Sequence, residues 1–142
     1  MELLRVVGRR CTLLWTEQVL TELNDWGSAK DPKNAMISLM IKSVPENGPP
    51  FGTPACKPLG DGLFEFRKEK HRGPKVRVLW FYGDSAETLI VCVRAFVKTF
   101  PKTPPEEIAA TNDERRRYAA AVQAKTLLTE DGSDLLRKKG KR

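Results

Sequence analysis

The period of the hydrophobic positions changes along the chain and separates a helical region from a strand region. In residues 16–26, four apolar side chains recur at helical spacing and would share one face of a helix: Val19, Leu20, Leu23 and Trp26. Thr16 can accept amide hydrogens of the first turn, so a helix is predicted to begin directly after it.

A second helix is predicted to begin at Asp31-Pro32 and to be stopped by Pro45, Gly48, Pro49 and Pro50. Aspartate accepts hydrogen bonds from the first turn, and proline is tolerated at the first helical position. Apolar residues are dense enough to bury more than half of the circumference: Met36, Ile37, Leu39, Met40 and Ile41. The two segments predict a helical hairpin, and the Pro- and Gly-rich residues 45–62 predict a connector.

From residue 63 to residue 98 the apolar period is two, which is typical of strands. Strands are predicted over 63–67, 76–82 and 88–98, with a turn at 71–74 between the first two. The third strand has apolar residues on both faces, so we expect it to be central.

The remaining segments complete the predicted fold. Residues 3–7 and 12–15 could each form an edge strand, and a helix is predicted from Thr103, where Glu106 would complete a capping box. We therefore expect one α+β domain over residues 1–128. It would have a small antiparallel sheet, made of a three-stranded meander and an N-terminal edge strand. The helical hairpin and the C-terminal helix would cover one face of this sheet.

Composition narrows the class of protein. A chain of 142 residues suffices for one domain. It contains no run of about 18 apolar residues, the length that a membrane-spanning helix needs. The N-terminus lacks the apolar core of a secretory signal, and Cys11, Cys56 and Cys92 lack the spacing of a metal site. We expect free thiols in a reducing cytoplasm, and a disordered basic tail over residues 129–142.

The formal net charge of +7 is unevenly distributed. Residues 1–63 are neutral, whereas residues 64–102 hold nine basic and four acidic side chains. A basic segment of this kind favours a polyanionic partner such as nucleic acid. An ordinary solvated sheet surface would show the same composition, so charge alone leaves both interpretations open.

The predicted strand register places several of these basic residues on one face of the sheet. A hairpin that turns at Arg72 places Arg67 opposite Arg77 on one sheet face. The other face would carry the pairs Phe64–Trp80 and Phe66–Val78. On the third strand, alternation puts four residues on a common face: Cys92, Arg94, Phe96 and Lys98. Opposed like charges at about 5 Å are destabilising, so the arginine heads either splay into water or bind an anion.

Three motifs, in this order, resemble the HigB-like, phage-derived branch of the RelE/ParE toxin superfamily. They are Leu59-Gly60-Asp61-Gly62-Leu63-Phe64-Glu65-Phe66-Arg67, then Val76-Arg77-Val78-Leu79-Trp80-Phe81, then Ala95-Phe96-Val97-Lys98-Thr99-Phe100-Pro101-Lys102-Thr103-Pro104. An arginine-rich helix follows them, as in that family. The resemblance is strong over residues 47–118.

This resemblance implies a toxin of a two-gene toxin–antitoxin module that cleaves mRNA on the ribosome, with no metal and no cofactor. The ribose 2′-hydroxyl attacks the adjacent phosphate, which requires cations at the phosphate oxygens. By motif, Arg67 and Arg77 would hold the scissile phosphate, and Lys98 would stabilise charge or transfer a proton. RNA-binding residues implied alongside them are Lys75, Phe96, Lys102 and His71. Where the family has a second lysine, this chain has Thr99.

The resemblance also implies partners. They are a helix-turn-helix antitoxin similar to HigA, joined with the toxin in a hetero-oligomer, together with the ribosome and mRNA, but no membrane. Two alternatives stay open at this point. One is a gyrase-inhibiting toxin of the ParE type, and the other is a non-catalytic RNA- or protein-binding derivative of the fold.

Overall fold

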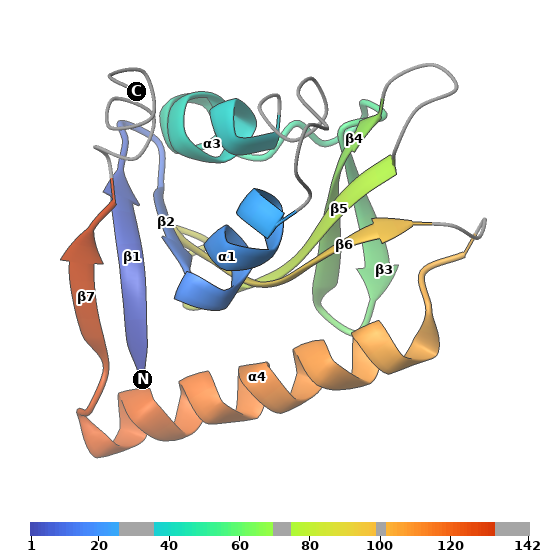
Figure 1. The fold of residues 1–142 in the computed structure, drawn as a ribbon. Coiled ribbons are helices and arrows are strands. Elements are labelled where there is room, and N and C mark those ends of the chain that lie inside the picture. Colours follow the sequence, from blue (N-terminus) through green and yellow to red (C-terminus); the bar gives the residue numbers. More distant parts are fainter. Residues whose placement is uncertain (26–35, 70–74, 99–101, 133–142) are drawn as a thin grey trace.

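A mixed sheet of seven strands runs through the middle of the protein, with helices on both faces (Figure 1). The computed structural model describes residues 1–25, 36–69, 75–98 and 102–132. The strand order is β3-β4-β5-β6-β2-β1-β7. The architecture is α+β as expected, but the sheet is larger than predicted and is not purely antiparallel.

The predicted meander is present as β4 (Leu63–Glu69), β5 (Lys75–Tyr82) and β6 (Leu89–Lys98), which pair antiparallel. The β4–β5 register is the one expected from the sequence: Phe64 pairs with Trp80, Phe66 with Val78 and Arg67 with Arg77. Strand β6 is the middle strand of the seven, which confirms its predicted central place.

Two strands at the N-terminus are internal, and the prediction of an edge strand there is wrong. Strand β2 (Thr12–Trp15) pairs parallel with β6, and β1 (Glu2–Val7) pairs antiparallel with β2. The outer neighbour of β1 is β7 (Leu128–Asp131), which runs parallel to it. Ordered structure therefore continues past residue 128, where the tail was expected to start.

The other edge of the sheet is β3 (Cys56–Gly60), which lies inside the segment predicted to be a connector. It pairs antiparallel with β4. Pro58 has no amide hydrogen, so it protects an edge strand from further pairing and also hides the strand from a sequence pattern.

The helices of the first layer follow the predicted pattern in part. Helix α1 (Glu17–Asp25) begins after Thr16, whose Oγ1 accepts a hydrogen bond from Val19 N–H at 3.3 Å. Residues 36–38 are helical and continue into the π-helix η1 (Leu39–Ser43) and then into α3 (Val44–Asn47). Of the predicted stop residues, Gly48 ends the helix as its C-cap, with a positive φ of 82°. Pro45 does not end it, because it lies in the first turn of α3, where its missing N–H is tolerated. The predicted start at Asp31-Pro32 lies outside the described residues.

Helix α4 (Pro105–Ala124) crosses the opposite face of the sheet, so the expectation of helices on one face only is wrong (Figure 1). The meander has apolar residues on both of its faces, and each face needs a cover. The cluster under α4 contains Leu3, Leu14, Leu63, Phe81, Val91, Val93 and Tyr118. The cluster under α1, η1 and α3 is larger and includes Trp15, Leu23, Met40, Phe66 and Trp80.

The glycine motif that preceded β4 in the sequence forms the β3–β4 turn. Gly60, Asp61 and Gly62 all have positive φ, at 96°, 54° and 78°. Arg115 of α4 donates a hydrogen bond from its Nη1 to Asp61 O at 2.7 Å, and its guanidinium lies 5.8 Å from the ring centre of Phe81. One arginine of the arginine-rich helix therefore fastens this turn to α4.

The three cysteines are buried and unpaired, as the sequence predicted. No helix in the described ranges is both long and apolar enough to cross a membrane.

Candidate anion-binding site

Arg67 and Arg77 lie opposite each other on the α4 side of the sheet and share a buried carboxylate. Arg67 Nε donates to Glu65 Oε1 at 2.8 Å, and Arg77 Nε lies 3.4 Å from the same oxygen. The side chain of Glu65 is fully buried and that of Arg77 is 4% exposed, whereas that of Arg67 is 24% exposed. The chain itself supplies a buried anion between the two arginines, and this carboxylate offsets their mutual repulsion.

A hydroxyl from the start of α4 completes this carboxylate's environment. Thr103 Oγ1 donates to Glu65 Oε2 at 2.6 Å, across 38 residues of sequence. The predicted capping box of Thr103 and Glu106 is therefore wrong: the helix begins after Pro104 without a side-chain cap. A buried carboxylate requires several partners to offset its desolvation. The hydroxyl of Thr103 therefore binds Glu65 and does not cap the helix.

A second ion pair joins the same sheet face to α4. Arg94 Nε donates to Glu107 Oε2 at 2.9 Å, and the hydrogen bond with this carboxylate raises the pKa of Arg94 above its usual value. Cys92 was expected on this face but lies on the other. A bulge in β6 at Val93 makes Leu79 pair with Arg94 and the next residue, Trp80, pair with Cys92.

The structure brings some of the predicted site residues together in the β5–β6 register. Phe96 pairs with Arg77 and is partly exposed, and Lys75 pairs with Lys98 one step further along the same face. Only the backbone of Lys98 is described. Lys102 is exposed just before Thr103, and His71 lies outside the described residues.

A surface hollow of about 350 Å³ opens beside Arg67 at the outer edge of β4. It is lined by Thr53, Pro54, Ala55, Arg67 and Lys68. Both charged residues in the lining are cations. The exposed part of Arg67 therefore faces a space of a size that holds small ligands.

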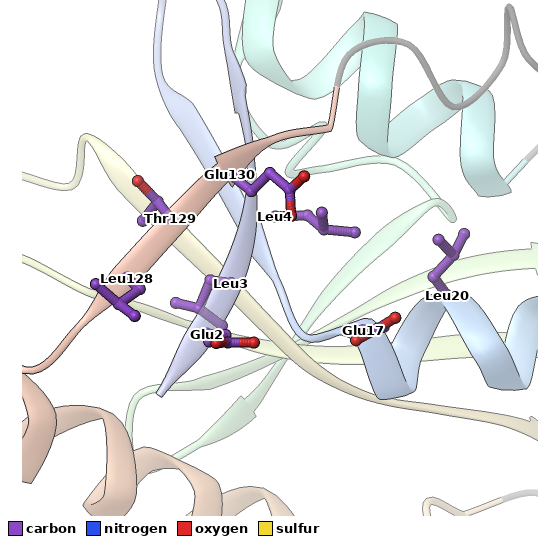
Figure 2. Close-up of a pocket in the computed structure, with 8 residues that line it drawn as sticks. All are labelled: Glu2, Leu3, Leu4, Glu17, Leu20, Leu128, Thr129 and Glu130. Carbon is purple, nitrogen blue, oxygen red and sulfur yellow. The ribbon is translucent and has the colours of Figure 1, made fainter.

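A second hollow, of about 310 Å³, lies between β1, β7 and α1 and has the opposite charge (Figure 2). Its three charged lining residues are Glu2, Glu17 and Glu130, and four leucines supply most of the rest. Carboxylates repel phosphate groups, so this hollow does not extend the cationic site. In the described part of the chain, no three His, Cys, Asp or Glu side chains gather closely enough to hold a metal ion.

Two residues of the network, Glu65 and Thr103, were missed as site residues by sequence reasoning. A signal for Glu65 was available, because positions 65 and 67 alternate onto one face and a carboxylate there could offset the opposed arginines. Thr103 gave no such signal, since its partner is distant in sequence and its position before Pro104 resembles an N-cap.

The fold and this face define a small α+β protein with a cationic cluster braced by a buried carboxylate. Residues 25–117 match the family described as Phage derived protein Gp49-like (DUF891). The match covers more than half of the chain, so the protein belongs to this family, which is part of the RelE/ParE toxin-like group. A comparison with curated proteins finds no match.

Proposed function

We propose that the protein is the toxin of a two-gene toxin–antitoxin module and cleaves mRNA on the ribosome without a metal. One observation carries the proposal: the side chain of Arg67 is partly exposed, and its guanidinium is held in place by a hydrogen bond to buried Glu65. A cation that is already oriented loses little conformational freedom when it binds a phosphate. Family membership supports the class of protein, a toxin of the RelE/ParE-like group. The geometry of Arg67 supports a phosphate group of RNA as the part of the substrate that is bound.

The reaction needs positive charge where the phosphate becomes more negative. As the 2′-hydroxyl attacks, charge builds on the non-bridging oxygens, and a fixed guanidinium stabilises it. In this proposal Arg67 contacts the phosphate. Arg77 shares the Glu65 carboxylate with Arg67 and adds positive charge from its buried position. Lys98 is included in the proposed site because the β5–β6 register pairs it with Lys75, two residues beyond Phe96. The products are a 2′,3′-cyclic phosphate and a 5′-hydroxyl.

The test is expression of the wild-type protein and of three separate variants, Arg67→Ala, Arg77→Ala and Lys98→Ala. We expect growth arrest with wild type, relieved by an antitoxin encoded beside it, and new mRNA 5′ ends within codons. Loss of one such cation should lower the cleavage rate about 10²–10³-fold. Arg116→Ala is the control, since Arg116 is exposed and pairs only with Asp113 among the described residues. If all three variants fold and still arrest growth, the proposed site is wrong.

A second candidate has its own supporting observation. Arg77 is almost completely buried and bonded within the protein, donating also to Val76 O at 3.0 Å. A network of this kind fits a structural role in a non-catalytic RNA- or protein-binding derivative of the fold. That candidate predicts no growth arrest. A gyrase-inhibiting toxin is the other outcome, with arrest, intact mRNA and a DNA-damage response.

A further inference from the structure

We infer that the hollow at the outer edge of β4 is a second phosphate subsite, which holds the RNA backbone next to the cleaved position. The inference rests on the proposed function and adds a path for the substrate. It assigns a binding role to Lys68, which follows directly after the first sequence motif and is not part of it.

The wall of the hollow is preformed. Thr53 Oγ1 donates to Pro50 O at 2.7 Å and accepts from Ala55 N–H at 3.2 Å, which closes a compact turn. Arg67 N–H donates to Ala55 O at 2.8 Å, so this turn is fastened to β4 where β3 begins. A ligand entering here meets a surface that needs little rearrangement.

Two cationic residues of β4 contribute to the lining of the hollow. Arg67 and Lys68 are consecutive in β4, so their side chains leave on different faces, yet both line the hollow. The hollow lies beside the part of β4 that continues past its pairing with β3. Lys68 is partly exposed, and none of the side chains that the structure describes forms an ion pair with it, so its charge can attract a phosphate.

The rest of the lining suits a nucleotide. Pro54 and Ala55 provide an apolar wall for a ribose or base, and a volume of about 350 Å³ lies within the roughly 300–1,000 Å³ of small-ligand sites. Arg67 belongs both to the Glu65 network and to this hollow. One strand of RNA can thus bind Arg67 at the cleaved phosphate and Lys68 at a neighbouring one.

Electrostatics favours this direction over the path toward α4. The first turn of α4 carries Glu106, an exposed carboxylate that repels a phosphate backbone, whereas Glu107 is neutralised by its ion pair with Arg94. The two charged residues that line the hollow, Arg67 and Lys68, are both cations. We therefore expect the RNA to leave the Arg67 site over this edge.

The binding test uses a single-stranded RNA of about nine nucleotides, within the usual site size, with 2′-O-methyl groups throughout so that it cannot be cleaved. Fluorescence anisotropy gives Kd over a range of salt concentrations. Lys68→Ala should raise Kd roughly five- to tenfold and lower the slope of log Kd against log salt by about 0.7, the effect of one lost phosphate contact. Lys68→Arg should restore both values. Lys42→Ala is the matched control, because Lys42 is an exposed lysine of η1.

Three outcomes of the binding measurement itself would overturn the inference, and a competition experiment gives a fourth. They are unchanged binding by Lys68→Ala, an equal loss with Lys42→Ala, and no binding of the RNA by wild type. Competition by inorganic phosphate at concentrations as low as those of the RNA would also overturn it, since that indicates a site for a free anion.

Cleavage on programmed ribosomes separates this inference from the proposed function. If wild type cleaves, Lys68→Ala should need a higher concentration for half-maximal rate and reach nearly the same maximum. If wild type cleaves and Lys68→Ala matches it at every concentration, only the subsite is wrong. If wild type does not cleave, the proposed function fails.

Discussion

Arg67 and Arg77 face each other across the β4–β5 pair and share one oxygen of buried Glu65. Opposed like charges repel, and a lone buried carboxylate is strongly disfavoured, but together the three groups offset each other's cost. The group retains a net positive charge and presents it at the surface only through Arg67. Stability and the proposed phosphate binding therefore depend on the same side chains.

Removing this carboxylate should destabilise the fold. We expect Glu65→Ala to lower the free energy of unfolding by about 3–5 kcal/mol, because it leaves buried guanidinium charge without a partner. Glu65→Gln keeps the shape and should cost less. Urea unfolding measures both, with Glu106→Gln as an exposed control on α4. A value for Glu65→Ala equal to that of the control would contradict the network.

The bond from Thr103 to Glu65 gives a second prediction. Thr103→Val keeps the size of the side chain but removes the donor, so it should cost about 1–2 kcal/mol. Glu106→Ala should have almost no effect, since Glu106 does not cap the helix. Urea unfolding of the two variants side by side distinguishes the network from a capping box. A larger loss for Glu106→Ala would favour the box.

Local patterns in the sequence predicted much of the fold. The alternation in residues 63–98 was strong enough to give the meander, its central strand and the Arg67–Arg77 register. Strand β3 was missed because Pro58 and the flanking glycines resemble a loop, and β7 because all four of its residues are exposed. Such edge strands form through pairing with a neighbour, and their own hydrophobic pattern does not reveal them.

The candidate site was predictable to the same degree. Motif and alternation identified the two arginines, but the partners that hold them are set by tertiary contacts. The bulge at Val93 shows the difference most clearly, since one extra residue moves Cys92 to the other face. Strict alternation along a strand of ten residues cannot anticipate it.

Burial of the thiols leads to a prediction about pH. Burial raises the pKa of Cys56 from its ordinary value of 9.0 to about 12, and it also raises the pKa of Cys92. The folded protein then keeps protons that the unfolded chain releases. Stability from this source is complete below pH 9 and is lost as the pH rises from about 9 toward 12. Urea unfolding between pH 8 and about pH 11 should show the decrease, and Cys56→Ala should make it smaller.

The same burial should protect the thiols from alkylation. At pH 8 we expect iodoacetamide to label Cys56 in the folded protein at least about a hundredfold more slowly than in urea, because the reactive thiolate is scarce and covered. Mass spectrometry of timed samples measures the rate. Equal rates in the folded and unfolded protein would show that this cysteine is accessible.

The arginine-rich part of α4 gives the last prediction, because its neighbouring arginines have different surroundings. Arg115 holds the β3–β4 turn through Asp61 O and lies near Phe81, whereas Arg116 pairs only with Asp113 among the described residues and is largely exposed. Arg115→Ala should therefore cost about 1–2 kcal/mol of unfolding free energy, and Arg116→Ala less than about 0.5 kcal/mol. Alanine favours a helix equally at both positions, so the difference between the variants reports the turn. If urea unfolding gives equal values, Arg115 does not fasten the turn, and its charge would have to serve another purpose, such as binding RNA.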